Sequence, residues 1–142
     1  SLPKGAVINA NDPRFEKPGA MPERIAALCQ ETNQPVPTTP AEYARCIFDS
    51  LADAYVKVLD QLQDAAGVTI DSINIVGGAS ANKLLNQLTA NATGKTVYAG
   101  PVEATVLGSI ITQMQAAGVI SSLEEGRQII KNSTLQAEFK PV

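Results

Sequence analysis

The sequence predicts a helix-rich α/β domain with a short, partly parallel sheet. Apolar residues recur at three- and four-residue steps over long stretches of the chain, which is typical of amphipathic helices. Two short runs with strand character, 68–76 and 96–99, flank one of these helical stretches. They therefore predict a β-α-β unit whose two strands lie parallel, joined by a right-handed crossover. Two strands make a thin sheet, which indicates part of a larger fold.

The chain begins with an irregular lead-in over residues 1–21. Turn formers dominate this segment, and only Val7-Ile8 has the character of a short strand. Pro22 suits the first position of a helix over 22–32. Helical spacing predicts that this helix buries Ile25, Leu28 and Cys29.

A second helix is predicted over 40–66, which makes 22–66 the helical section of the chain. Thr39-Pro-Ala-Glu42 has the pattern of a capping box with proline at N1, and Gly67 suits the C′ position. An apolar stripe follows the cap and predicts the buried face of the helix: Tyr43, Ile47, Leu51, Tyr55, Val58, Leu59 and Leu62.

Residues 68–118 predict a βαβα unit. Its first helix runs from Ser80 to about Ala92, ends at Gly94 and buries its three leucines, which are Leu84, Leu85 and Leu88. Its second helix follows Pro101 and ends at Gly118. The expected buried face of that helix consists of Val106, Leu107, Ile110, Ile111 and Met114.

The last section, 119–142, predicts one helix and a tail. Ser122-Leu-Glu-Glu125 is a second capping-box pattern and starts a short helix near 123–131. The tail from Ser133 shows no hydrophobic period.

Composition excludes several classes of function. A chain of 142 residues has room for one domain, and its net charge of −3 provides no basic surface, so we expect no nucleic-acid partner. No apolar run reaches membrane-spanning length and no signal-peptide pattern is present, so we expect a soluble, cytoplasmic protein without a membrane partner. The chain contains no histidine, the commonest general base and metal ligand. We predict no metal site in it.

Cys29 and Cys46 are the two cysteines. A disulfide between neighbouring helices is one interpretation, and it would stabilise the N-terminal half by about 3 kcal/mol. Two buried thiols are the other interpretation, and a reducing cytoplasm favours them.

The most informative motif is the Gly77-Gly78 turn after the apolar run that ends at Val76. Glycines here let a backbone approach a nucleotide closely, but the same pair also suits a tight strand-to-helix turn without a ligand. Asn82 has the same two interpretations, as a contact to an adenosine or as a residue that caps the helix. The turn lacks the patterns of a Walker A loop and of a dinucleotide fingerprint.

A second segment at a fixed distance makes the turn specific, and together they resemble the FGGY family of carbohydrate kinases. The resemblance covers nearly the whole chain. It is carried by Asn9-Ala-Asn-Asp-Pro-Arg-Phe15, Pro18-Gly19, Glu31-Thr-Asn-Gln-Pro-Val-Pro37, Val76-Gly-Gly-Ala-Ser-Ala-Asn-Lys-Leu-Leu-Asn86, Ala99-Gly-Pro-Val-Glu-Ala-Thr105 and Phe139-Lys-Pro141. The segment 99–105 and the loop 12–15 point to the branch of the family that acts on L-rhamnulose.

The resemblance implies a fold of the actin-like ATPase type, in which two ribonuclease H-like domains enclose ATP and sugar. It implies transfer of the γ-phosphoryl group of ATP to the 1-hydroxyl of L-rhamnulose, with Mg²⁺ on the phosphates. The chain would be the C-terminal part of the C-terminal domain. Its adenosine contacts would be Gly77, Gly78, Ala79 and Asn82, with Ala79 standing where the family usually has a third glycine.

The family's phosphate-binding loops and catalytic aspartate lie upstream of the matching region, so no catalytic residue is expected in this chain. We expect it to be a part of a longer kinase, with Ser1-Leu2 a remnant of cloning, and to be inactive without the N-terminal half, its expected partner. The alternative interpretation is a non-catalytic helical interaction domain with a purely structural glycine turn.

Overall fold

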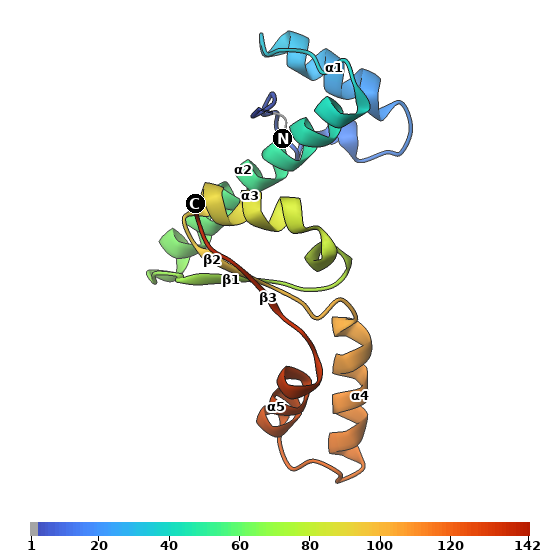
Figure 1. Ribbon diagram of the computed structural model, residues 1–142, viewed down its shortest axis with the longest axis vertical. Coiled ribbons are helices and arrows are strands. Elements are labelled where there is room, and N and C mark those ends of the chain that lie inside the picture. The colour runs from blue at the N-terminus through green and yellow to red at the C-terminus, as the bar shows by residue number, and fades with distance from the viewer. Residues whose placement is uncertain (1–2) are drawn as a thin grey trace. The chain divides into compact units, whose positions relative to one another are not determined.

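The computed structural model describes residues 3–142, so the expectation for Ser1-Leu2 lies outside the described residues. In chain order its elements are η1 (Pro13–Phe15), α1 (Met21–Glu31), α2 (Pro40–Ala66), β1 (Ser72–Ile75), η2 (Gly78–Ala81), α3 (Lys83–Thr93), β2 (Thr96–Ala99), α4 (Ala104–Ala116), α5 (Leu123–Ser133) and β3 (Ala137–Phe139) (Figure 1). The predicted class, a helix-rich α/β chain with a small mixed sheet, is confirmed. The chain divides into two compact units, one formed by residues up to 70 with 91–93, the other by 71–90 with 94–142.

In the first unit, the lead-in is held by side chains. The N–H of Gly5 donates to Asp49 at 2.9 Å, and the N–H of Ile8 donates to the Ser50 hydroxyl at 3.0 Å. The amide of Gln34 bonds both the N–H and the carbonyl of Val7, at 2.7 and 2.6 Å. The predicted strand at Val7-Ile8 is therefore wrong, because side chains satisfy the backbone groups that a neighbouring strand would otherwise bond.

Helix α1 packs its apolar face into the core of the first unit. This core consists of Ala6, Ile8, Ile25, Leu28, Cys29 and Cys46, and Phe15, Met21, Val36 and Tyr43 pack around it. The predicted burial of all three α1 residues is confirmed.

Helix α2 has the predicted ends but buries a different face. The Thr39–Glu42 capping box is complete, and Gly67 ends the helix with φ of 63°. The buried residues of α2 are Cys46, Asp49, Ser50, Ala52 and Leu59. Most of the predicted stripe is exposed, including Val58 at 46% and Leu62 at 54%. The period of the apolar residues marked the helix correctly, but most of these side chains are exposed among residues 3–142.

The second unit contains a three-stranded sheet in the order β1-β2-β3. Strands β1 and β2 are parallel, with Ser72 opposite Thr96, which confirms the predicted β-α-β pairing. Strand β3 pairs antiparallel with β2, with Val97 opposite Phe139 (Figure 1). The tail from Ser133, which shows no hydrophobic period, therefore supplies a third strand that was not predicted.

Helix α3 begins later than predicted. Residues 78–81 form the short 3₁₀ turn η2, and α3 starts at Lys83 with Asn82 as its N-cap. Ser80 is not the N-cap, because its hydroxyl bonds back to the carbonyl of Gly77 at 2.7 Å. The buried residues of α3 are Leu85, Asn86, Thr89 and Ala90, while Leu84 is exposed.

Helices α4 and α5 pack side by side (Figure 1). Their close contact is at Gly126, where an added Cβ would lie 2.4 Å from Cγ2 of Ile111. Ile111 is the buried residue of α4, whereas Val106 and Ile110, both predicted to be buried, are exposed. Gly118 ends α4 as predicted, and the Ser122 cap starts α5, which runs on to Ser133.

Candidate functional site

The glycine turn and the segment 99–105, which the sequence singled out, are bonded to each other. The N–H of Gly77 donates to the carbonyl of Pro101 at 3.0 Å, and the N–H of Gly100 donates to the carbonyl of Ile75 at 2.8 Å. Gly77 has φ of 75°, a backbone conformation that residues with a Cβ atom rarely adopt. These two hydrogen bonds fix the start of the turn at the ends of the two parallel strands.

The 3₁₀ turn η2 (Gly78–Ala81) presents open backbone. The N–H groups of Ser80 and Asn82 bond the carbonyls of Gly77 and Ala79, each at 3.0 Å. Gly78 and Ala79 are exposed, and a Cβ built on Gly78 meets nothing within 4 Å. The turn therefore leaves room at Gly78 for a group that lies against the backbone, such as a ligand.

Asn82 acts as the N-cap of α3. Its Oδ1 accepts a hydrogen bond from the N–H of Leu85 at 3.1 Å, which satisfies one of the unpaired donors of the first helical turn. Of the two interpretations of Asn82, the helix-capping role is therefore confirmed. Its Nδ2 takes no part in this cap, so that group remains available for a ligand contact.

Asn86 is a residue of this site that the sequence reasoning missed. It is fully buried, and its Nδ2 donates to the carbonyl of Ser80 at 2.9 Å. Its Oδ1 is buried without a hydrogen-bond partner among the described residues. Such an unsatisfied acceptor costs about 1–3 kcal/mol. The spacing of Leu84, Leu85 and Leu88 places Asn86 off the predicted buried face, so the sequence carried no signal for it.

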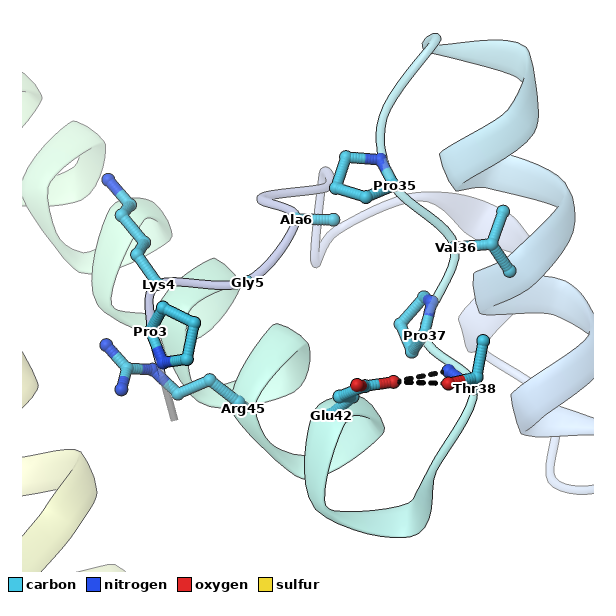
Figure 2. A pocket seen from close by; sticks show the side chains of 10 residues that line it. All are labelled: Pro3, Lys4, Gly5, Ala6, Pro35, Val36, Pro37, Thr38, Glu42 and Arg45. Atoms are coloured by element: carbon cyan, nitrogen blue, oxygen red, sulfur yellow. Dashed lines mark hydrogen bonds between the residues drawn. The ribbon is translucent and has the colours of Figure 1, made fainter. Parts of the chain in front are cut away.

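A hollow of about 280 Å³ lies in the first unit, between the lead-in and the loop before α2 (Figure 2). Figure 2 shows that Lys4, Arg45 and Glu42 lie around it with apolar groups of Pro35 and Pro37. The carboxylate of Glu42 accepts three hydrogen bonds from Thr38 and Thr39, and the N–H of Thr38 is the main cause that lowers its pKa. Since Glu42 is committed to the cap, the hollow offers no free acid or base from it.

The two cysteines are adjacent, buried and present as free thiols. The two thiols lie close enough for each to affect the pKa of the other. Burial raises the pKa of Cys29, and burial together with the neighbouring Cys29 raises the pKa of Cys46 to about 11. The disulfide between them stays a prediction.

No three acidic, cysteine or histidine side chains gather in a metal-binding group within residues 3–142. In the same part of the chain, every helix is too short or too polar to cross a membrane.

Comparison with known proteins identifies the family to which the chain belongs. A sequence model of the C-terminal domain of the FGGY family of carbohydrate kinases matches residues 1–117. The rhamnulokinase of Enterobacter sp. (strain 638) is 48% identical over 135 residues, which cover 95% of this chain and 28% of that protein. The rhamnulokinase of Oceanobacillus iheyensis is 44% identical over 128 residues, covering 90% of the chain and 27% of the relative. The rhamnulokinase of Klebsiella pneumoniae (strain 342) is 43% identical over 135 residues, with coverages of 95% and 28%.

The chain thus spans little more than a quarter of the length of these relatives. Because the family match covers most of its residues, the chain belongs to the FGGY family of carbohydrate kinases, within the C-terminal domain, whose fold is that of the actin-like ATPases.

Proposed function

We propose that this chain is the adenosine-binding part of an ATP-dependent kinase that phosphorylates L-rhamnulose at its 1-hydroxyl. The similarity to rhamnulokinases over 90–95% of the chain supports the substrate and the reaction. The residues of the chain itself support only the nucleotide side of this proposal. Its adenosine contacts are Gly77, Gly78, Ala79 and Asn82.

The observation that carries the proposal is the open backbone at Gly78. The bond from Gly77 to Pro101 holds the turn in place, while Gly78 and Ala79 face outward with free space beside Gly78. A flat base or a ribose fits against such a surface without displacing a side chain. The Nδ2 of Asn82 adds a donor at the start of α3, next to the positive end of the helix dipole.

ATP supplies the γ-phosphoryl group, and Mg²⁺ neutralises its charge during transfer. We assign both to parts of the kinase outside this chain, together with the catalytic base. The chain alone is therefore inactive, since phosphoryl transfer depends on positioned groups around the γ-phosphate. We place the kinase in the cytoplasm.

We further propose that the remaining part of the kinase covers the apolar faces that this chain exposes. On α2 these are Ile47, Tyr55, Val58 and Leu62, with exposures from 36% to 54%. On α4 and the residues before it they are Val102, Val106 and Ile110, from 46% to 53%. Large apolar side chains exposed along a helix are typical of an interface, and the relatives have more than twice this length of additional chain to supply it.

Calorimetric titration of the chain with ATP and ADP tests the adenosine site. Saturable binding is expected, and Gly78→Val should weaken it at least tenfold, because the branched side chain fills the space beside the turn. Gly108→Val is the matched control, because Gly108 is also exposed with nothing within 4 Å of an added Cβ but lies on α4. Equal losses in the two variants would contradict the site assignment.

A non-catalytic interaction domain is the second candidate, and the exposed apolar faces favour it. Mixing the chain with the preceding part of the Enterobacter relative separates the two functions. Recovery of L-rhamnulose phosphorylation supports the kinase, and association without activity or nucleotide binding supports the interaction domain.

A further inference from the structure

Asn86 combines two features that packing alone does not explain. It is completely buried in α3, although asparagine has a lower helix propensity than leucine. It also leaves its Oδ1 without a partner among the described residues. A leucine has the same branched shape, with two methyl groups in place of the amide oxygen and nitrogen, and carries no acceptor that could stay unsatisfied. The amide therefore needs a reason beyond filling the core.

The hydrogen bond made by its other atom supplies that reason. The Nδ2 of Asn86 donates to the carbonyl of Ser80 at 2.9 Å, six residues back along the chain. Ser80 lies in the 3₁₀ turn that connects the glycine pair to α3. The turn's own bonds, from the N–H and hydroxyl of Ser80 to Gly77, are local. The bond from Asn86 ties the turn to the body of the helix.

We propose that Asn86 is the positioning residue of the adenosine site, holding the backbone of 78–81 in the conformation that receives the nucleotide. This inference rests on the proposed function, since it concerns the same turn. Asn86 is buried and acts through Ser80, so it sets the geometry of the contacts without making one. The unpaired Oδ1 is then a cost to stability that accompanies the orientation of the amide toward Ser80.

The proposal predicts an unusual pair of effects for Asn86→Leu. Nucleotide affinity should fall about tenfold, because the turn loses its tie to α3. The midpoint of urea unfolding should change little, because the variant exchanges the unsatisfied Oδ1 of Asn86 for an unsatisfied carbonyl of Ser80. A residue with a merely structural role would instead lower the unfolding midpoint in the same proportion as the affinity.

Asn86→Asp adds a readout that depends on pH. The ionised carboxylate cannot donate to Ser80, whereas the protonated carboxyl can. Burial favours the neutral form, so the affinity of this variant, relative to the parent at the same pH, should recover as the pH falls from 8 to 5. No recovery at low pH, with the fold intact, would overturn the role of the donated hydrogen bond.

Amide hydrogen exchange measures the turn without any nucleotide. In Asn86→Leu the N–H groups of Ser80 and Asn82 should exchange about tenfold faster, while that of Gly94 at the far end of α3 keeps its protection. Val97→Ala, a fully buried residue of β2, is the control for a general loss of stability in the same unit. Equal exchange at the turn in the parent and in Asn86→Leu would overturn the proposal.

Nucleotide binding and amide hydrogen exchange together separate this inference from the proposed function. If the parent chain does not bind ATP or ADP, the adenosine site of the isolated chain fails, and the exchange of the two turn amides alone decides whether Asn86 holds the turn. If the parent binds and Asn86→Leu binds equally well, the positioning role fails while the adenosine site stands.

Discussion

The backbone N–H of Gly77 donates to the carbonyl oxygen of Pro101 at 3.0 Å. This bond joins residues 24 positions apart in the chain, one from each of the two segments that together suggested a nucleotide site. It means that the position of the glycine turn depends on the backbone around Gly100 and Pro101. Changes in that second segment should therefore affect the first.

Gly100→Ala should destabilise the second unit strongly. Gly100 has φ of 121°, and an added Cβ would lie 2.9 Å from the carbonyl oxygen of Leu135, which is backbone and cannot swing away. We expect a loss of about 3 kcal/mol in the free energy of unfolding, measured with urea.

Gly94→Ala is the control for this prediction. Gly94 also has a positive φ, of 66°, but an added Cβ there meets nothing within 4 Å. It should lose only the cost of the left-handed backbone, about 1–2 kcal/mol. If the two substitutions lower the unfolding midpoint equally, the close approach to Leu135 does not matter.

The sequence predicted well those features that neighbouring residues determine. In the capping box of Thr39 and Glu42, and in the cap that Ser122 makes to Glu125, the two partners are only three residues apart. Their hydrogen bonds therefore follow from the local sequence alone. The glycines that end α2 and α3 were found for the same reason. The parallel pairing of β1 and β2 followed from the helix between them.

Features that depend on distant partners were missed. Strand β3 is three residues long and forms because Phe139 lies opposite Val97, some forty positions earlier. Such a short strand has no measurable period of its own. The start of α3 was misplaced because the hydroxyl of Ser80 bonds back to Gly77, where the capping pattern suggests a forward bond. In the candidate site, the glycines and Asn82 were visible in the sequence, but the tie from Asn86 to Ser80 required the fold.

The carboxyl groups around Arg14 should respond unequally to its replacement. The Arg14 guanidinium bonds Glu31 at 3.1 and 2.8 Å and is the main cause that lowers the pKa of Glu31. The pKa of Asp12 is lowered first by the backbone N–H of Arg14, which any residue at 14 retains. Arg14→Gln should therefore raise the pKa of Glu31 more than that of Asp12, as measured by NMR titration of the carboxyl carbons.

The direction of the pH dependence follows from these lowered pKa values. Both ionised carboxylates stabilise the loop above their ordinary pKa values, and this stabilisation is lost as the pH falls through the lowered ones. Arg127→Gln, at an exposed ion pair of α5, should leave both titrations unchanged. A larger shift at Asp12 than at Glu31 would show that the guanidinium is not the dominant partner of Glu31.

The cysteine pair should make the chain sensitive to alkaline pH. The pKa of a thiol in an unfolded chain is about 8.5, whereas the pKa of Cys46 in the folded chain is raised to about 11 by burial and by Cys29. The folded state therefore keeps a proton that the unfolded state gives up, and the stability that this adds below the unfolded pKa is lost as the pH rises toward the folded one. Urea unfolding at pH 8 and pH 10.5 should show this loss, and Cys46→Ala should reduce it.

Alkylation distinguishes the two states of the pair. Free buried thiols should react slowly with iodoacetamide in the folded chain and rapidly in urea, because the neutral thiol is the unreactive form. A pair that stays unreactive in urea, until a reductant is added, would establish the disulfide between Cys29 and Cys46.

Two leucines one turn apart on α2 should differ in what their removal costs. Leu59 is 7% exposed and Leu62 is 54% exposed. In the isolated chain, Leu59→Ala should lower the free energy of unfolding by about 2–5 kcal/mol, whereas Leu62→Ala should change it by less than about 0.5 kcal/mol. The cost of Leu62→Ala should increase once the preceding part of a related rhamnulokinase is supplied, because we expect that part to cover the face containing Leu62. Association measured by analytical ultracentrifugation should then weaken for Leu62→Ala. An unchanged association, with the two parts bound to each other, would place the interface on another face of the chain.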